Sequence, residues 1–400
     1  MTTETKKKNT KSAKKKGSSG ISQIHLVEAY LQGRYDFRFN EISLNIEMRS
    51  LYDNDWKICN DNSLWVELHK NNIPVPITNL RIILRSDFVP RFNPLKHYFQ
   101  NLNQWDGQTD YIQKYASYVR LAPGEDRGQF FYHFKKWCVR AVKCALIDGY
   151  FNKQAFVLSD DGKGQNIGKS TWCRFLCPKE LSDYIAEDMG GNDKDSRLLL
   201  CKNFLINLDE LAALARKEIN QLKSQLSKDQ INERLPYGST NTVLQRVASF
   251  IGSTNQSTFL MDETGSVRWL CFMVESIDFS YKSEFDMDHL WAQAYYLAND
   301  KSFDETMSRS DVNQNEVRNK KFQTMTPEHE LLLNYLKKPV NDSDGEYMTA
   351  TSIVDYIQQI TMTKQRLTKV NMGKALNQEL FEKKKTGGST LYLIQKINNQ

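Results

Sequence analysis

The sequence has 400 residues, of which 40% are hydrophobic and 26% are charged, an ordinary composition for a soluble globular protein of two or three domains. No run approaches 18 consecutive apolar residues, and no hydrophobic stretch follows the N-terminal lysines, so the sequence predicts neither a transmembrane helix nor a secretory signal. Seven scattered cysteines, often flanked by apolar residues, favour reduced thiols in a cytoplasmic protein over disulfides or a zinc site.

Positive charge is concentrated at the two ends of the chain. Residues 1–20 and residues 361–400 each carry a net charge of +6, so residues 21–360 must sum to −6 because the whole chain carries +6. We expect 1–20 to be a disordered basic tail. Basic ends are typical of proteins that contact nucleic acid, because neutralising phosphates supplies most non-specific affinity. The alternative is that these lysines only aid solubility.

Two segments precede the first chemical motif. Residues 21–110 are predicted to form a small α+β domain, with strand-like runs at Phe37 to Ile46 and at Leu80 to Leu84. Residues 111–150 are predicted to be a helical segment whose apolar side chains recur at three-to-four spacing and face the core. These side chains are Phe130, Phe131, Phe134, Trp137, Cys138, Ala141 and Cys144.

Residues 162–171 read Gly-Lys-Gly-Gln-Asn-Ile-Gly-Lys-Ser-Thr and follow an apolar run, Gln154 to Ser159, that is predicted to be a buried strand. A strand that enters a glycine-containing loop ending in Gly-Lys-Ser/Thr favours a phosphate-binding P-loop. The usual first glycine would fall on Lys163, between two glycines, and a surface turn is the alternative. The predicted ATP ligands are Gly164, Asn166, Gly168, Lys169, Ser170 and Thr171, with the Ser170 hydroxyl on Mg²⁺.

Two later strand-like runs end in polar side chains that suit ATP hydrolysis. Phe204 to Leu208 is followed by Asp209 and Glu210, the Walker B arrangement, in which Asp209 would hold Mg²⁺ through water and Glu210 would polarise the attacking water. The alternative is a strand followed by solvated acids. The run Val247 to Thr254 ends in Asn255, whose amide can orient that water and sense the γ-phosphate.

A single arginine, Arg268, follows a Thr-Gly turn and precedes the apolar run Leu270 to Val274. In this position an arginine could reach the γ-phosphate of a neighbouring subunit as a finger. The predicted catalytic residues are therefore Lys169, Glu210, Asn255 and Arg268. Residues 151–300 are predicted to form the ATPase core.

The remaining residues are predicted to be a linker and a DNA-binding domain. Residues 301–326 are polar and linker-like, whereas residues 327–400 show three helical patterns and then two strands around a Gly-Gly turn, the pattern of a winged helix. A winged helix with a basic third helix and a basic wing suits duplex DNA, and one that contacts only protein is the alternative. The candidate DNA contacts are Lys369 and Lys374 on the helix and Lys383, Lys384 and Lys385 on the wing.

The order of these motifs resembles the virulence-associated E family of phages and mobile elements, which is similar to superfamily 3 AAA+ helicases. Two departures are the displaced P-loop glycine and Val267, which stands where the family usually has the first of two arginines. The resemblance is carried by Asn93-Pro-Leu95, Trp105-Asp-Gly107, Gln165 to Thr171, Leu208-Asp-Glu-Leu211, Arg234 to Gly238, Arg246 to Asn255 and Asp262-Glu-Thr-Gly265.

The resemblance implies a bacterial, ATP-driven ring on single-stranded DNA, a homo-oligomer that we expect to be a hexamer. It also implies a DNA-gripping loop between the Walker B and sensor strands, a place that residues 217–246 occupy. Lys223, Lys228 and Arg234 are then candidates for DNA contacts, with a solvated helix face as the alternative. Arg246, also a candidate DNA contact, could instead serve the ATP site between subunits.

The sequence thus predicts an α/β protein with a superfamily 3-like P-loop AAA+ core, a small α+β N-terminal domain, a helical segment and a C-terminal winged helix. The expected function is ATP- and Mg²⁺-dependent DNA unwinding or origin remodelling. The alternative is a DNA-binding regulator whose nucleotide site acts as a slow switch. A small-molecule P-loop kinase is less favoured, because it needs neither a winged helix nor an arginine acting on another subunit.

Overall fold

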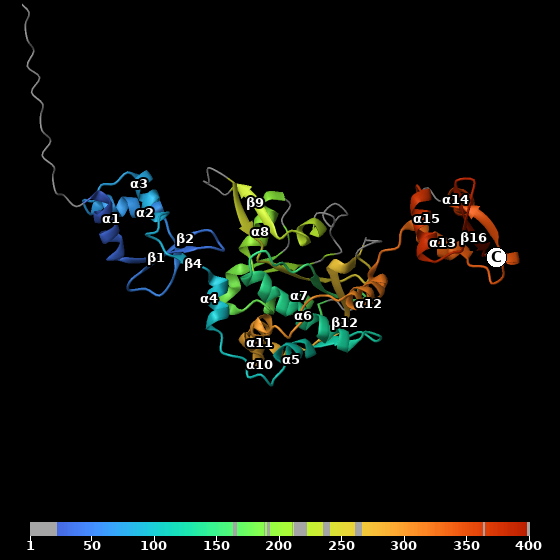
Figure 1. The fold of residues 1–400 in the computed structure, drawn as a ribbon, viewed down its shortest axis with the longest axis horizontal. Helices are drawn as coiled ribbons and strands as arrows, with labels where there is room; N and C mark the ends of the chain where they lie inside the picture. The colour runs from blue at the N-terminus through green and yellow to red at the C-terminus, as the bar shows by residue number, and fades with distance from the viewer. Residues whose placement is uncertain are drawn as a thin grey trace, which may run out of the picture.

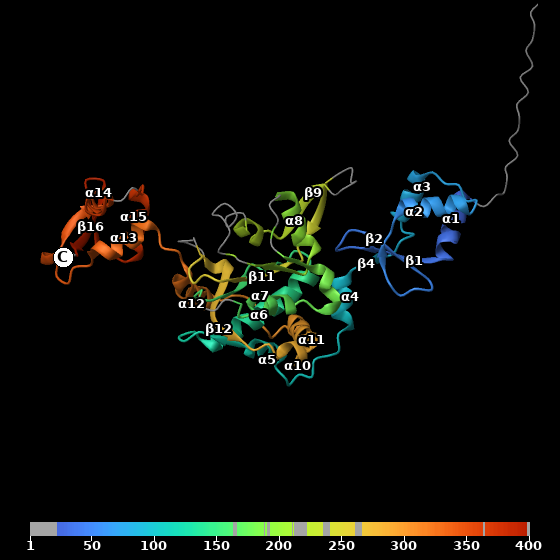
Figure 2. The same cartoon turned by 180° about the vertical axis from the view of Figure 1, so that it is seen from behind.

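The structure is a computed structural model, which describes residues 22–162, 166–187, 189, 193–209, 211, 222–234, 241–260, 266–362 and 365–397. The predicted tail 1–20 lies outside these residues. The chain is a mixed α/β protein with several sheets, and its N-terminal and C-terminal bodies lie at opposite ends of a larger central body (Figures 1 and 2). Among the described helices, none has the length and hydrophobicity that crossing a bilayer requires.

The N-terminal body packs three helices on a four-stranded sheet of order β3-β2-β1-β4. The predicted strand at 80–84 is wrong, because these residues end the helix α3. Leu80, Ile83 and Leu84 are buried at helical spacing while Ile82 is 67% exposed, so one face of the helix contacts the core. The elements are α1 (Gln23–Gln32), β1 (Tyr35–Asn40), β2 (Ile46–Ser50), β3 (Lys57–Ile58), α2 (Asp61–Lys70), α3 (Ile77–Leu84) and β4 (Arg91–Phe92).

The central body is built on a six-stranded sheet of order β5-β12-β6-β11-β8-β7. The five strands from β12 to β7 are parallel, and only β5 at the edge is antiparallel. The carboxyl ends of the parallel strands therefore meet at one edge of the sheet, where α/β proteins bind ligands. The strands are β5 (Val119–Leu121), β6 (Ala155–Ser159), β7 (Ile185–Glu187), β8 (Leu205–Leu208), β11 (Ser249–Thr254) and β12 (Trp269–Ile277).

Both faces of this sheet are covered, because alternate residues of its strands face opposite cores. Phe156 and Leu158 of β6 belong to one apolar cluster, and Ala155 and Val157 belong to the other. The first face is covered by α4 (Pro94–Asn101), α5 (Tyr111–Ser117), α6 (Arg127–Leu146), α7 (Lys169–Phe175), η1 (Lys179–Tyr184), α10 (Tyr281–Glu284) and α11 (Met287–Asn299), and the second by α8 (Asp193–Lys202) and the helical residues 222–226.

The structure differs from the predicted end of the N-terminal domain at residue 110 and from the predicted linker at 301–326. Leu95 and Phe99 of α4 are buried in the central core, so this body begins before residue 110. The predicted linker 301–326 contains α12 (Arg309–Asn319) and η4 (Lys320–Phe322). Asn315 and Asn319 donate to the carbonyl of Trp269 at 2.9 and 2.8 Å, so this polar helix is fixed to the sheet by buried amides.

The C-terminal body has the three helices and the hairpin that the sequence predicts. The hairpin turns at Gly387 and Gly388, which have φ of +57° and +82°, a region that favours glycine. Two short strands that the sequence did not predict, β13 and β14, also pair with β16. The elements are α13 (Pro327–Tyr335), β13 (Leu336–Lys337), η5 (Asp342–Asp344), β14 (Glu346–Thr349), α14 (Ala350–Thr361), α15 (Lys369–Gln378), β15 (Lys383–Thr386) and β16 (Ser389–Lys396).

One buried titratable group on α6 links the fold to pH. His133 is fully buried, and neither of its ring nitrogens has a hydrogen-bond partner. Burial, followed by the nearby Arg318 guanidinium, lowers the pKa of His133 from 6.5 to about 3. The folded protein therefore keeps this imidazole neutral.

We expect His133→Leu to weaken the acid sensitivity of folding. Between pH 6.5 and about 3 the unfolded chain protonates this histidine and the folded chain does not, so the free energy of unfolding falls as pH falls, by up to about 1.4 kcal/mol per pH unit. Urea unfolding between about pH 4 and 7 should give a flatter profile for the variant. His25→Leu, at an exposed residue of α1, is the control, and equal slopes for both variants would contradict the assignment.

Candidate functional site

The loop that joins β6 to α7 has three left-handed residues among those that the structure describes. Gly162, Asn166 and Gly168 have φ of +77°, +65° and +89°, a region that glycine adopts readily and that asparagine tolerates. Residues 163–165, and with them the predicted ligand Gly164, lie outside the described residues. A buried strand thus enters a glycine-containing loop, and α7 begins at Lys169, which confirms the strand-loop-helix context that the sequence predicts.

Lys169 is brought together with Asn255 and with an acid that the sequence analysis missed. Its side chain is 4% exposed and forms an ion pair with Asp160, which is 3% exposed. Its Nζ also donates to Asn255 Oδ1 at 2.9 Å, and Asp160 accepts from the Gly162 N–H at 2.9 Å. Asp160 is therefore the buried counter-ion of Lys169, and an acid directly after an apolar strand was the signal for it.

Asp209 meets two serine hydroxyls at the same edge of the sheet. Its Oδ1 accepts from Ser170 Oγ at 2.6 Å and from Ser253 Oγ at 2.8 Å, and the two hydroxyl oxygens lie 2.9 Å apart. Carboxylate and hydroxyl oxygens are the hard ligands that Mg²⁺ prefers, so this donor set fits the cation. Ser253 of β11 is a further residue that sequence reasoning missed.

The second oxygen of Asp209 faces an arginine of α7. Arg174 Nη2 lies 3.2 Å from Asp209 Oδ2, and its Nε donates to Glu187 Oε1 at 2.8 Å. The carboxylate of Glu187, followed by that of Asp209, raises the pKa of the Arg174 guanidinium. Thr171 lies half-buried in the first turn of α7, and Glu210 lies outside the described residues.

Arg268 lies at the other edge of the sheet. It immediately precedes β12, whose first residue, Trp269, pairs with Ala155 at the start of β6, whereas Lys169 follows the end of β6. The start and the end of β6, Ala155 and Ser159, are four residues apart, which is about 13 Å along a strand. Arg268 Nε donates to Ser227 Oγ at 3.1 Å. This geometry separates Arg268 from the loop of its own chain.

Arg246 is not available for the DNA contact or the intersubunit contact that the sequence analysis considered. It is 1% exposed and donates to the carbonyls of Ala248, Leu226, Lys228 and Asn152 at 2.9, 2.9, 3.2 and 2.7 Å. A guanidinium with five donors satisfies several carbonyls that would otherwise be buried without partners. The two predictions for Arg246 are therefore wrong, and its role is structural.

The other candidate DNA contacts lie in two places, in and around the strand pair of β9 and β10 and in the C-terminal body. β9 (Gln230–Arg234) pairs with β10 (Asn241–Gln245), and Arg234 is exposed at the end that leads into residues 235–240, which are outside the described residues. Lys223 and Lys228 are only half-exposed. The five candidate lysines of the C-terminal body are all exposed: Lys369 and Lys374 on α15, and Lys383, Lys384 and Lys385 on β15.

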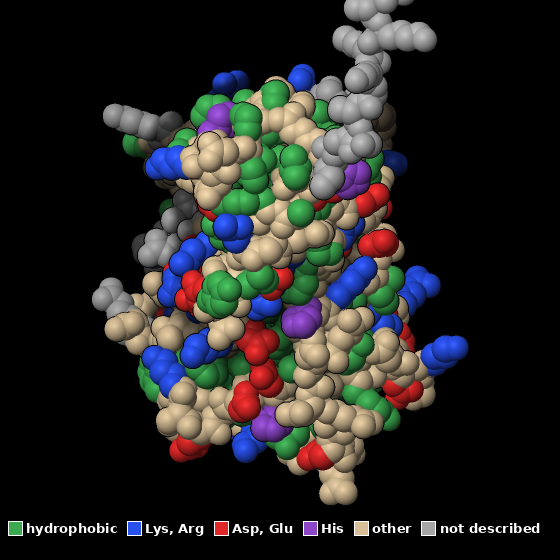
Figure 3. Space-filling view, turned by 90° about the vertical axis from the view of Figure 1, so that its left-hand side faces the viewer, with side chains coloured by type: hydrophobic (Ala, Val, Ile, Leu, Met, Phe, Trp, Pro, Cys, Tyr) green, Lys and Arg blue, Asp and Glu red, His purple; other side chains and the backbone are tan. Residues whose placement is uncertain are grey.

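The N-terminal body pairs many of its cations with acids. Arg38 Nε lies 2.5 Å from Glu47 Oε2, and Arg49 Nη2 lies 2.9 Å from Asp36 Oδ2. Figure 3 views the molecule from this side and shows basic and acidic side chains next to each other rather than a field of one sign. Among the residues that the structure describes, this face therefore shows no concentrated positive charge of the kind that attracts a phosphate backbone (Figure 3).

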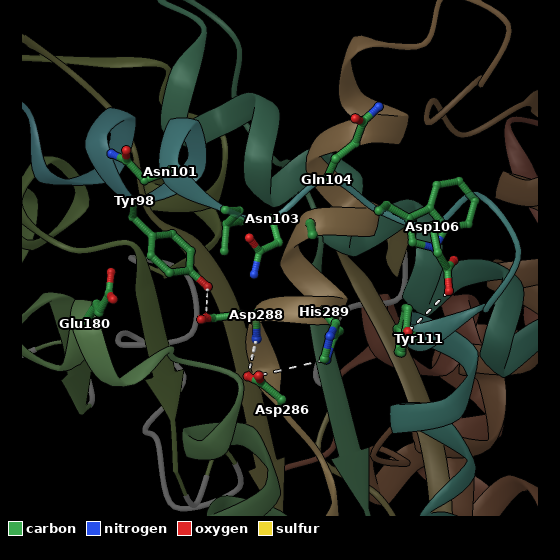
Figure 4. Close-up of a pocket in the computed structure, with 13 residues that line it drawn as sticks. Tyr98, Asn101, Asn103, Gln104, Asp106, Tyr111, Glu180, Asp286, Asp288 and His289 are labelled. Carbon is green, nitrogen blue, oxygen red and sulfur yellow. Dashed lines mark hydrogen bonds and ion pairs between the residues drawn. The ribbon is translucent and has the colours of Figure 1, made fainter.

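A separate cavity of about 240 Å³ lies between α4, η1 and α11. Figure 4 shows Tyr98, Glu180, Asp286, Asp288 and His289 around it, and the Tyr98 hydroxyl donates to Asp288 at 2.6 Å. The segment that contains Trp105-Asp-Gly107 borders it. Its described lining includes no residue that the sequence analysis assigned to catalysis, nucleotide or DNA.

Removing the Lys169 charge should destabilise the protein without nucleotide, because Asp160 would remain buried without its counter-ion. Losing one partner of a buried pair typically costs about 3–5 kcal/mol. We expect Lys169→Met to lower the midpoint of urea unfolding and the double variant with Asp160→Asn to recover part of the loss. Arg120→Met, which breaks an exposed pair with Glu275, is the control and should change little. Additive effects of the two replacements would exclude the pairing.

Comparison with known proteins gives the family. The profile of the virulence-associated protein E-like domain matches residues 99–324. Three solved apo structures of the C-terminal region of NrS-1 are similar at 13% identity, with TM-scores of 0.47, 0.48 and 0.49, and cover 94% of this chain and 99–100% of theirs. No curated protein sequence matches the chain. The family profile spans more than half of the 400 residues, which confirms the resemblance carried by the motifs: the chain belongs to the virulence-associated protein E-like domain family.

Proposed function

We propose that this protein is an ATP-dependent DNA helicase or origin-remodelling ATPase of a bacterial mobile element or phage, acting on single-stranded DNA as a homo-oligomeric ring. The observation that carries the proposal is the convergence of Lys169, the Ser170–Asp209 contact and Asn255 at one sheet edge. These groups are the parts that phosphoryl transfer from ATP to water needs. They support a superfamily 3-like AAA+ core with the loop 162–168 as its P-loop.

In this proposal each residue has one task. Lys169 and the backbone N–H groups of the loop neutralise the phosphate charge. Ser170 and Asp209 would hold Mg²⁺, and the ion would supply charge stabilisation for the transferred phosphoryl group. Glu210 accepts a proton from the attacking water, and Asn255 orients that water.

The ribbon of β9 and β10 connects this site to DNA in the proposal. It is inserted between Asp209 and β11, and Arg246 fixes its base to the core by binding the carbonyls of Leu226 and Lys228 before β9 and of Ala248 after β10. Because Ala248 directly precedes β11 and Asn255 directly follows it, a movement of Asn255 would be transmitted along β11 to the base of the ribbon. Arg234 is the exposed cation of the ribbon and is assigned to the single strand, with Lys223 and Lys228 beside its base.

The C-terminal body is assigned to duplex DNA as a winged helix. Its three helices and the β15–β16 hairpin support this assignment, as do the five exposed lysines on α15 and β15. Lys384 Nζ lies 3.4 Å from the centre of the Tyr347 ring, and Lys383 Nζ donates to Asn377 at 2.8 Å. Such contacts hold the ammonium groups on the hairpin, where phosphates could reach them.

A second function, a DNA-binding regulator with a slow nucleotide switch, is favoured by the ion pair of Lys169 with Asp160. Phosphate must compete with this buried carboxylate for the lysine, which opposes rapid turnover. The displaced P-loop glycine and the single arginine also favour a slow switch over a rapid ATPase. Stimulation of ATP turnover by single-stranded DNA is expected of the helicase and not of the switch.

ATP hydrolysis should depend on Lys169 and Glu210 in different ways. Lys169→Ala should weaken ATP binding, whereas Glu210→Gln should retain ATP and slow hydrolysis by about 10²- to 10⁴-fold, because only the proton acceptor is lost. Phosphate release and fluorescent nucleotide binding would be measured with and without single-stranded DNA. Lys153→Ala, an exposed lysine before the start of β6, is the control. Parental hydrolysis by Glu210→Gln would contradict the Walker B assignment.

Arg268 should act on a neighbouring subunit, because it lies far from the loop of its own chain. We expect Arg268→Ala to bind ATP normally and to lose about 10³-fold or more in hydrolysis. Mixing it with Lys169→Ala should restore partial activity at interfaces that combine an intact loop with an intact arginine. Full activity of Arg268→Ala alone, or no recovery in mixtures whose co-assembly is confirmed by native mass measurement, would exclude this role.

Replacing Lys383, Lys384 and Lys385 with alanine should weaken duplex binding and leave ATP hydrolysis intact. The slope of log affinity against log salt should fall by about 0.9 for each phosphate that the variant no longer neutralises. Fluorescence anisotropy of a labelled duplex, measured across a salt series, would give this slope. Lys57→Ala, at an exposed lysine of the N-terminal body, is the control. An unchanged slope would place the duplex surface elsewhere.

A further inference from the structure

An exposed aromatic side chain, Phe279, lies against the loop between β6 and α7. β12 runs parallel to β6, with Met273 level with Ser159 at the end of β6, and continues to Ile277. The residues after β12 therefore emerge beyond the sheet edge that holds Lys169. A β-carbon placed on Gly168 would lie 2.4 Å from Cζ and 2.6 Å from Cε1 of Phe279, so the edge of the ring points at this glycine.

The turn that carries Phe279 is firmly held. Asp278 accepts from the Ser280 N–H at 2.9 Å, and its own N–H donates to the Tyr118 carbonyl at 2.9 Å. Tyr281 is fully buried, and the centre of its ring lies 4.9 Å from the centre of the Phe175 ring on α7. The turn is thus fixed to the helix that follows the loop, and the position of the Phe279 ring relative to the loop is defined by packing.

Phe279 nevertheless remains 43% exposed. Lys282 Nζ lies 5.0 Å from the centre of its ring, which adds a cation beside this aromatic surface. An apolar ring that is rigidly placed and open to solvent next to a phosphate-binding loop suits the aromatic part of a nucleotide. Stacking against an aromatic side chain contributes to base binding for every base, since every base has a π-face.

We infer that Phe279 is the surface against which the base of the bound nucleoside triphosphate stacks, an inference that rests on the proposed nucleotide site. Phe279 supplies affinity for the base and not discrimination between bases, because a phenyl ring has no hydrogen-bonding group to distinguish them. The phosphates are held by the loop and Lys169, independently of this ring.

The test compares ATP with inorganic tripolyphosphate, which has the phosphates and no base. Binding of each to the full chain would be measured by calorimetry for the parent, Phe279→Ala, Phe279→Leu and Phe279→Tyr. We expect the alanine and leucine variants to lose about tenfold in ATP affinity, the tyrosine variant to retain it, and tripolyphosphate affinity to stay constant. The ratio of ATP to GTP affinity should not change. Tyr52→Ala, which removes a 95% exposed aromatic ring from the N-terminal body, is the control.

The possible results separate the two proposals. ATP affinity that is unchanged in Phe279→Ala and Phe279→Leu would overturn the base-stacking inference and leave the nucleotide site standing. Equal losses for ATP and tripolyphosphate would also overturn it, since the ring would then act on the loop through Gly168. A parent protein that binds neither ligand would exclude the nucleotide site itself.

Discussion

The parallel pairing of β6, β11 and β8 is the constraint on which the candidate site depends. Parallel strands that are buried on both faces deliver their following residues to one edge of the sheet, so groups from residues 160, 209 and 255 meet although they are distant in the sequence. β11 lies between the other two strands, which places Asn255 beside Lys169 and Ser253 beside Asp209. A different strand order with the same local motifs would separate these side chains.

Buried polar side chains, rather than apolar contacts alone, attach the outer elements to this sheet. Arg246 joins the segment before β9 to the residues before β6 through backbone carbonyls. Asn315 and Asn319 attach α12 to the start of β12. Each interaction satisfies carbonyl groups that burial would otherwise leave unpaired, which would cost free energy. These elements are therefore fixed in place despite their polar sequences.

The ion pair of Lys169 with Asp160 determines how readily the proposed nucleotide site could work. Both groups are nearly fully buried, so the lysine is already compensated before phosphate arrives. An incoming phosphate gains less from a lysine that must leave or share a buried carboxylate. In the proposed function, the strength of this competition would distinguish a rapidly cycling ATPase from a slow switch. It depends on one residue, Asp160, that the familiar loop motif does not include.

The sequence by itself determined the local features: the strand-loop-helix around Lys169, the strands before Asp209 and Asn255, the C-terminal hairpin and the family. These depend on glycine positions and short apolar runs, which act over a few residues. It did not predict α12, whose buried face is polar, or the helix at Leu80, where a short apolar run fits either structure. Only the tertiary structure decided that Ser253 joins Asp209, that Arg246 is buried and that Phe279 lies against Gly168, because these contacts join strands through a pairing order that no local pattern encodes. The pairing of Asp160 with Lys169 lies within one strand-loop-helix unit, and the path of the loop brings the two side chains together.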